Sequence, residues 1–315
     1  MIFYKTVAAG NDFIHVNKDE LNVGLNCCNA INVQSALALR LCERQTGAGA
    51  DGVVFYRVNP EWVDFEIYNR DGGEAELSGN GMAGVSALLF YLNRWKEEEP
   101  IVLHTKAGVK THRCLRRKDN VFRLRIEIGD PHFQDTRFFP FLKPGEREYR
   151  YRDIAFYPVS VGNPHAVVRL NKNYSDDELE AMGKMLEGAE IFPFRANIEF
   201  VVPTTNQDIR AVDFAEGENF RIFFYERGVG PTLASSTGSA AVYAVLRQLA
   251  LTNGSLVIPA NHSEKGDKED TDRWDERIKV TGDSTIFLEN TTTIIYKGDY
   301  LDFKSSRKSG DLGFL

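Results

Sequence analysis

The sequence predicts an α/β protein built from two similar domains. Its 315 residues exceed the usual size of a single hydrophobic core, which favours two domains. Residues 69–84 (NRDGGEAELSGNGMAG) recur as residues 226–241 (ERGVGPTLASSTGSAA) at a constant offset of 157, with five identities in sixteen positions. In each half, strand-like runs accompany a stretch with helical apolar spacing. Each copy is therefore expected to wrap a strand-rich layer on a helix.

Alternating or β-branched apolar runs predict the strands of both halves. In chain order these runs are Val53–Tyr56, Asp64–Tyr68, Val121–Ile128, Ala166–Leu170, Ile198–Val202, Phe220–Tyr225 and Thr292–Tyr296. Helices are predicted over residues 36–44, after Ser78 and after Ser235, where apolar residues recur every three or four positions. The turn Gly129-Asp130-Pro131 indicates a boundary. The domains are therefore expected at 1–128 and 129–298, followed by a segment 299–315 that could return to the first domain.

A second pair of motifs recurs in the same order. Gly10-Asn11-Asp12-Phe13 opens the first half, and Gly162-Asn163-Pro164-His165 stands in the second. The asparagine precedes the repeated serine by 67 residues in the first half (11 to 78) and by 72 in the second (163 to 235). Two motifs at similar spacing indicate a duplicated domain.

Composition narrows the classes of function. The chain carries 38 basic and 45 acidic residues, a net charge of −7, which argues against a general nucleic-acid binder. No run approaches about 18 consecutive apolar residues, so no membrane span is expected, and no signal peptide is visible. Four cysteines that fit neither a zinc site nor a disulfide framework favour the reducing cytoplasm: Cys27, Cys28, Cys42 and Cys114. The charged segment 261–277 is expected to be a solvated loop, with a partner-binding segment as the alternative.

Ser78 and Ser235 each follow a turn and open a helix-like stretch. A glycine-rich turn before a helix exposes backbone N–H groups beside the positive helix end, which suits a carboxylate or phosphate. Two such turns facing each other would hold one carboxylate between them. The alternative is that both serines cap their helices. A serine hydrolase is disfavoured because the G-x-S-x-G elbow is absent, and no nucleotide-binding fingerprint or metal motif predicts a cofactor.

His165 and Glu226 belong to the repeated elements. As isolated residues, a histidine after proline and a glutamate before arginine would more often be structural. Their place within the repeat makes them candidates for proton transfer, because His and Glu are common acid–base residues.

A series of short motifs runs in order along the chain: Gly10-Asn11-Asp12-Phe13, Thr46-Gly47-Ala48-Gly49-Ala50-Asp51-Gly52, Tyr68-Asn69 with Asp71-Gly72, Gly79-Asn80-Gly81, Ala107-Gly108, Gly162-Asn163-Pro164-His165, Phe192-Pro193 with Arg195 and Asn197, and Glu226-Arg227-Gly228-Val229-Gly230 with Thr237-Gly238. With these motifs the chain resembles the diaminopimelate epimerase family, the cofactor-independent amino-acid epimerases of lysine and peptidoglycan synthesis. The resemblance runs from residue 5 to about 245 and weakens after about residue 255. It implies two similar α/β domains, each a β-barrel-like sheet around a central helix, with the active site in the cleft between them.

The resemblance also implies a role for each site residue. In the family one cysteine removes the α-proton and a second protonates the opposite face; these positions here hold Ser78 and Ser235. His165 and Glu226 would support this pair. The backbone holding the reacting carboxylate would be that around Gly79, Asn80, Ser236 and Thr237. The distal zwitterion would be gripped by Asn11, Asn69, Asn163, Asn197 and Arg227, an arginine suiting a carboxylate because the guanidinium binds it bidentately.

The departures from the family pattern lie at and near the positions expected to transfer the proton. Besides the two serines, Ser236 stands where glycine is usual, Pro231 where glutamate is usual, and Ala83-Gly84 where an Arg-Cys pair is common. Several neighbouring changes favour a natural divergent branch over an engineered pair of substitutions. A thiol loses its proton near pH ~8.5, whereas a hydroxyl holds its proton much more tightly.

Three functions therefore remain open from the sequence. The first is an isomerase acting at the α-carbon of diaminopimelate or a similar amino acid by two-base proton transfer, with the serines helped or replaced by the neighbouring acid–base residues. The second is a pseudoenzyme that binds an amino acid without turnover. The third is a related lyase or double-bond isomerase on another substrate. The expected partner is a small-molecule amino acid, and a homodimer is an assembly that the sequence leaves open.

Overall fold

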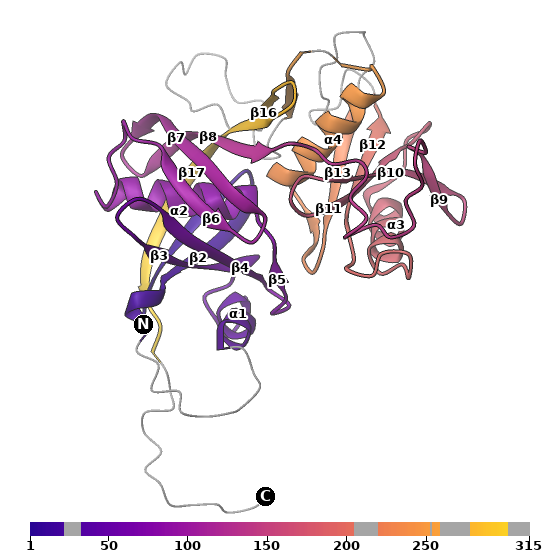
Figure 1. Cartoon of the computed structure of the whole chain (residues 1–315). Coiled ribbons are helices and arrows are strands. Elements are labelled where there is room, and N and C mark those ends of the chain that lie inside the picture. Colours follow the sequence, from indigo (N-terminus) through magenta and orange to yellow (C-terminus); the bar gives the residue numbers. More distant parts are fainter. Residues whose placement is uncertain (22–32, 205–219, 253, 259–277, 302–315) are drawn as a thin grey trace, which may run out of the picture.

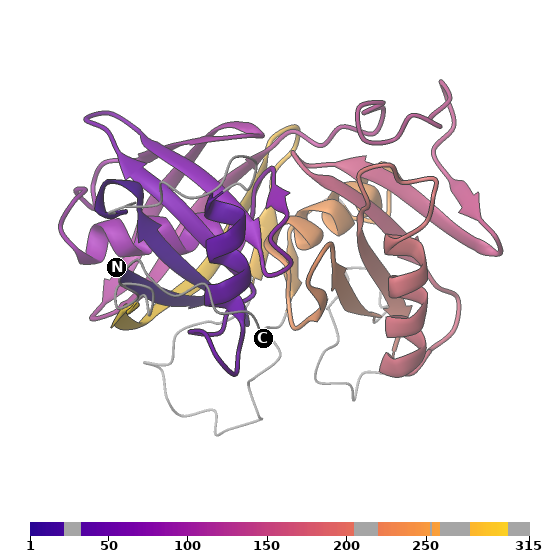
Figure 2. The same cartoon turned by 90° about the horizontal axis from the view of Figure 1, so that it is seen from below.

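The computed structural model describes residues 1–21, 33–204, 220–252, 254–258 and 278–301. Two β-sheets, each with its own central helix, lie side by side in the views of Figures 1 and 2. The helices are α1 Val33–Cys42, α2 Gly79–Tyr91, α3 Asp176–Glu187 and α4 Ser236–Gln248, with a 3₁₀ turn at Lys18–Glu20. The charged segment 261–277, Cys27 and Cys28 lie outside the described residues.

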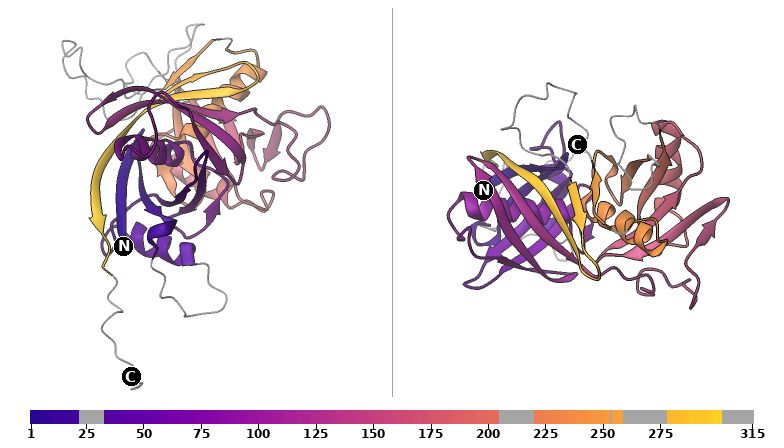
Figure 3. Two further views of the ribbon diagram at one scale, coloured as in Figure 1. Left: turned by 60° about the vertical axis from the view of Figure 1, so that its left-hand side comes forward. Right: turned by 90° about the horizontal axis from the view of Figure 1, so that it is seen from above.

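The larger sheet has eleven strands in the order β1-β2-β3-β4-β6-β7-β8-β17-β16-β15, with β5 paired to β4. Its ends join because β17 also pairs with β1, so that the eight strands from β1 to β17 close into a barrel. Helix α2 lies inside the ring of strands (Figure 3, left) and is buried along nearly its whole length. The strands are β1 Ile2–Ala8, β2 Asn11–Asn17, β3 Gly52–Val58, β4 Val63–Asn69, β5 Glu74–Ala75, β6 Ile101–Thr105, β7 Gly108–Lys118, β8 Val121–Gly129, β15 Leu256–Ile258, β16 Ile278–Thr281 and β17 Ile286–Asp299.

The second sheet has six strands in the order β14-β13-β12-β11-β10-β9. Helices α3 and α4 cover its opposite faces, as the alternation along β12 shows: Phe200 packs in the α3 cluster, whereas Val201 packs with α4. The strands are β9 Tyr149–Tyr151, β10 Ile154–Ser160, β11 Pro164–Arg169, β12 Asn197–Pro203, β13 Phe220–Glu226 and β14 Gly230–Thr232.

Both halves repeat one topology, as the internal sequence repeat predicts. In each, an antiparallel hairpin leads through a helix to a parallel strand, then to an antiparallel strand, a short strand and the central helix. The first half follows β1-β2-α1-β3-β4-β5-α2 and the second follows β10-β11-α3-β12-β13-β14-α4. The expected α/β fold of two pseudo-symmetric domains is confirmed. Every predicted strand run and helix overlaps an observed element, although Leu170 lies one residue beyond β11 and residues 43–44 lie beyond α1.

The sheet pairing departs from the division expected at residues 128/129 and 298/299. Strands β15 to β17 lie within the range assigned to the second domain, but they pair in the larger sheet. The reason is barrel closure: β17 runs antiparallel to both β8 and β1. Its inward positions, such as Leu288 and Ile294, bury their side chains in the barrel core. The chain thus returns to the first domain before residue 299, and residues 302–315 are not described.

The two central helices share one hydrophobic core. Buried residues of α2, α4, β8, β13 and β17 form a single cluster that spans both domains. Helix α4 packs against β10, β11 and β12 of its own sheet and also contacts β16, β17 and α2. Strands β16 and β17 are the part of the larger sheet that lies beside α4 (Figure 3, right). Among the described residues, no helix is both long and apolar enough to span a membrane.

Candidate active site

The predicted serine turns form the N-termini of the two central helices. Ser78 precedes α2 with extended backbone (φ −141°, ψ 123°), and its Oγ accepts a hydrogen bond from the Gly81 N–H at 3.2 Å. Ser235 precedes α4 in the same way (φ −129°, ψ 126°) and accepts from the Gly238 N–H at 3.1 Å. Both side chains therefore act as helix N-caps, a role for which serine is preferred.

The N-termini of α2 and α4 touch each other. A Cβ added at Gly79 would lie only 2.4 Å from the Ser236 Cβ, so this contact requires a glycine on one side. The Ser236 hydroxyl donates to Asn80 Oδ1, and Asn290 Nδ2 on β17 donates to both of these oxygens at 3.2 and 3.3 Å. This buried amide and hydroxyl network joins the two domains where the resemblance places the reacting carboxylate.

A small cavity lies between the domains beside these helix ends. All five residues predicted to grip the zwitterion line it, together with Ser78, Glu226 and Thr237. Its open volume is about 20 Å³, roughly the room for one water molecule. Five predicted residues are absent from its lining: Gly79, Asn80, His165, Ser235 and Ser236. The full lining is Asn11, Phe13, Asp51, Asn69, Ala75, Leu77, Ser78, Asn163, Asn197, Glu226, Arg227, Val229 and Thr237.

Glu226 ends strand β13 and presents the carboxyl group of the second domain to this cavity. Its Oε1 accepts from the Thr232 hydroxyl at 2.7 Å and from Asn11 Nδ2 at 3.1 Å. Removal from water raises the pKa of Glu226 to about 7, against the smaller opposing effect of the Thr232 hydrogen bond. A carboxyl group with this pKa can both hold and release a proton near neutral pH.

His165 lies behind the cavity. The ring is fully buried, with Nδ1 at 2.7 Å from Glu199 Oε1 and Nε2 at 2.9 Å from Asn163 Oδ1. Both ring nitrogens are therefore occupied within the protein. Asn163 does line the cavity, and its Nδ2 lies 3.5 Å from the Thr237 hydroxyl. His165 is therefore linked to the cavity by its hydrogen bond to Asn163. A role of His165 in proton transfer stays a prediction.

The predicted zwitterion-binding residues are bonded to one another across the domain interface. Asn69 Nδ2 donates to the Arg227 carbonyl at 2.9 Å, and the Arg227 N–H donates to Asn197 Oδ1 at 3.0 Å. The Arg227 guanidinium pairs with Glu76 and donates to the Phe194 carbonyl at 3.1 Å, and its predicted contact with a ligand carboxylate stays a prediction. A ligand carboxylate would have to displace the Glu76 side chain.

Three residues near the site were not predicted from the sequence. Asp51 lines the cavity, Thr232 donates to Glu226, and Glu199 holds His165. Asp51 stands inside the glycine-rich motif that carries the resemblance, which is the one signal that could have drawn attention to it. Among the described residues, no three His, Cys, Asp or Glu side chains are grouped to hold a metal ion. The two described cysteines, Cys42 and Cys114, are both free thiols.

The fold and this interdomain site define the class of protein: an isomerase of the epimerase and racemase type. The family model described as diaminopimelate epimerase matches residues 3–133 and 157–284, so the chain belongs to the diaminopimelate epimerase family. The resemblance stated from the sequence motifs is therefore confirmed.

Similar proteins agree with this assignment. A diaminopimelate epimerase of Methanocaldococcus jannaschii is 28% identical over 310 residues, covering 92% of this chain and 97% of that protein. One from Synechococcus sp. (strain JA-3-3Ab) is 32% identical over 307 residues, with the same coverage of each. Among solved structures, a probable proline racemase from Agrobacterium radiobacter K84 has a TM-score of 0.63 at 12% identity, covering 96% of this chain and 94% of that one. A hydroxyproline epimerase from Agrobacterium vitis has a TM-score of 0.58 at 14% identity, covering 95% and 91%.

Proposed function

We propose that this protein epimerises diaminopimelate, or a similar zwitterionic amino acid, by moving the α-proton from one face of the α-carbon to the other. The observation that carries the proposal is the shared lining of one cavity by Glu226 and the five predicted zwitterion-binding residues. The proposal places the reaction in cytoplasmic lysine synthesis, the role that the family resemblance implies. The partner is a free amino acid.

The helix ends supply the charge stabilisation that this reaction needs. Removing an α-proton places negative charge on the neighbouring carboxylate, and preorganised N–H donors lower the barrier where such charge develops. The first turns of α2 and α4 meet at Gly79 and Ser236. Their backbone N–H groups and the positive ends of both helices are suited to that carboxylate.

Proton transfer is expected to be unequal on the two faces. Glu226, with its pKa near 7, supplies a group that titrates at working pH. Ser78 borders the cavity from the barrel side, but its hydroxyl is a weak base and already caps α2. A slower exchange on the serine side is the expected consequence.

Substrate binding must widen the domain interface. A cavity of about 20 Å³ is too small for an amino acid, so the two domains have to separate there. The bond from Asn69 to the Arg227 carbonyl crosses between the domains and would open with them. Small interdomain movements of this kind are common in enzymes that close over their substrates.

A second candidate function is amino-acid binding without turnover. It is favoured by the capping geometry, because the oxygens of Ser78 and Ser235 both accept hydrogen bonds from their own helices. Ser235 is also only 2% exposed and does not line the cavity. Within the part of the chain that the structure describes, neither hydroxyl is hydrogen-bonded to a base that could take its proton.

Incubation with diaminopimelate in deuterated water separates the two candidates. We expect loss of the α-proton NMR signal with the wild type and no loss with Glu226→Gln. Calorimetric binding without any exchange would instead support the binding protein. Exchange that continues at the wild-type rate in Glu226→Gln would refute the assigned role of Glu226. A Ser78→Cys/Ser235→Cys variant with faster exchange would show that the scaffold still supports thiol chemistry.

A further inference from the structure

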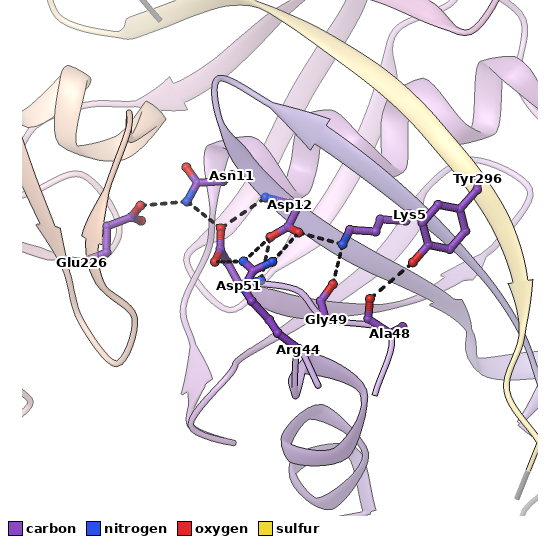
Figure 4. A network of polar contacts seen from close by, with 9 residues as sticks. All are labelled: Lys5, Asn11, Asp12, Arg44, Ala48, Gly49, Asp51, Glu226 and Tyr296. Carbon is purple, nitrogen blue, oxygen red and sulfur yellow. Dashed lines mark hydrogen bonds and ion pairs between the residues drawn. The ribbon is translucent and has the colours of Figure 1, made fainter. Parts of the chain in front are cut away.

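One side-chain amide connects carboxyl groups of the two domains. Asn11 Nδ2 lies 3.1 Å from Glu226 Oε1 and 3.3 Å from Asp51 Oδ2, so a single amide nitrogen donates to both (Figure 4). Asn11 is itself oriented by Asn80, whose Nδ2 donates to Asn11 Oδ1 at 2.7 Å. Asn11 and Asp51 belong to the barrel, whereas Glu226 belongs to the second domain. This link therefore exists only while the domains are in contact.

Asp51 is held in place by an ion-pair cluster within the barrel (Figure 4). Its Oδ1 accepts from Arg44 at 2.9 Å, and its Oδ2 accepts from the Asp12 N–H at 3.2 Å. Arg44 also binds both carboxylate oxygens of Asp12, at 2.9 and 3.1 Å, and Lys5 Nζ lies 2.8 Å from Asp12 Oδ2. The carboxyl group of Asp51 therefore faces Asn11 in one defined orientation.

The charge balance of this cluster opposes ionisation of Glu226. Two cations, Lys5 and Arg44, already face two carboxylates, Asp12 and Asp51. An ionised Glu226 would add a third negative charge beside Asp51 without a further cation in the cluster. Like charges in a partly buried site disfavour each other, so the protonated form of Glu226 is stabilised.

We propose that Asp51 is a positioning residue for the proton transfer: it orients Glu226 through Asn11, and its negative charge keeps Glu226 protonated while the domains are closed. This inference rests on the proposed function and deepens it, because it couples the proton held by Glu226 to contact between the domains. Separation of the domains would remove both Asn11 and Asp51 from Glu226. Closure would then favour uptake of a proton from water by Glu226, and the reaction uses this proton.

Other groups also face Glu226. Thr232 on β14 and Asn11 both donate to Glu226 Oε1, and each of these hydrogen bonds favours the ionised form against the charge of Asp51. Glu199 on β12 has a smaller effect that also disfavours ionisation of Glu226, but its carboxyl group is bonded to His165. Arg227, the next residue in the chain, directs its guanidinium to Glu76. Asp51 is thus the carboxylate that reaches Glu226 through a shared donor.

The test is a titration of Glu226 that needs no turnover. Carboxyl ¹³C NMR, with the Glu226 signal identified by its loss in Glu226→Gln, gives the midpoint directly. Asp51→Asn should lower this midpoint by about half a unit to one unit, because a neighbouring like charge is lost. Asp51→Glu keeps the negative charge, so the titration midpoint of Glu226 in this variant should return most of the way to the wild-type value.

Asp12→Asn is the matched control. It disturbs the same ion pairs but leaves the carboxylate that faces Asn11, so its shift should be less than half of that in Asp51→Asn. Equal shifts in both variants, or no shift in Asp51→Asn, would overturn the proposal.

The wild type offers an independent measurement if Asp51→Asn fails to fold. In the same titration, the carboxyl ¹³C signal of Asp51 should show an inflection at the pH where Glu226 is half ionised. An Asp51 signal without that inflection would also overturn the proposal. Loss of the proposed function would appear separately, as absent α-proton exchange in the wild type.

Discussion

Replacing Glu226 by glutamine should stabilise the folded protein at alkaline pH while it abolishes α-proton exchange. Burial raises the pKa of Glu226 from an ordinary 4.5 to about 7. Between these values the folded state keeps a proton that the unfolded chain has released, so stability falls as pH rises through this window. The difference of about 2.5 units corresponds to at most about 3.4 kcal/mol.

Glutamine imitates the neutral carboxyl group and cannot ionise. Its side-chain carbonyl can still accept from Thr232 and Asn11, as Glu226 Oε1 does. The variant and the wild type should therefore have nearly equal free energies of unfolding at pH 4. Their difference should grow above pH 4.5 and level off above pH 7, with the variant more stable by about 2–3 kcal/mol, since the cavity admits some water.

Urea denaturation at pH 4, 6 and 8 measures this difference. Glu98→Gln, at an exposed position, is the control and should change the free energy of unfolding by less than about 0.5 kcal/mol at every pH. A Glu226→Gln difference that is the same at pH 4 and pH 8 would refute the reasoning, because it would not arise from ionisation.

Three further substitutions test other parts of the site. Ser235→Ala removes the N-cap of α4 and should lower the free energy of unfolding by about 1 kcal/mol in urea denaturation; an unchanged value would contradict the capping role. Glu76→Gln releases the Arg227 guanidinium and should tighten diaminopimelate binding about tenfold by calorimetry, with no gain for an amino acid that lacks the second carboxylate. Gly84→Ala should destabilise the barrel by at least about 2 kcal/mol in thermal unfolding, because its Cβ would lie 2.4 Å from His15 Nε2; a normal melting temperature would exclude this clash.

Much of the fold was predictable because strand and helix periodicity are local properties. The apolar spacing after Ser78 and Ser235 identified both central helices, and the internal repeat identified the duplicated topology. Helix α3 was not predicted, although Ser175 and Glu178 form a capping box at its start. The position of β17 was not predictable either, since its pairing with β1 joins residues nearly 300 positions apart in the chain.

The residue types of the site were also predictable, but the hydrogen-bond and ion-pair partners of these residues were not. Sequence motifs selected six residues that all line one cavity: Asn11, Asn69, Asn163, Asn197, Glu226 and Arg227. The motifs gave no sign that the folded chain pairs the Arg227 guanidinium with Glu76. Asp51 had no assigned role because its contact with Asn11 depends on β2 lying parallel to β3.

The sequence by itself determined the family, the duplication and the presence of serines at positions 78 and 235, because these depend only on residue identity and order. The tertiary structure decided what these two serines contact. It makes Ser78 and Ser235 helix caps, and it places His165 behind Asn163. It also leaves Glu226 as a carboxyl group that titrates near neutral pH. Burial and charge at a site are summed over elements distant in the chain, so only the folded arrangement sets them.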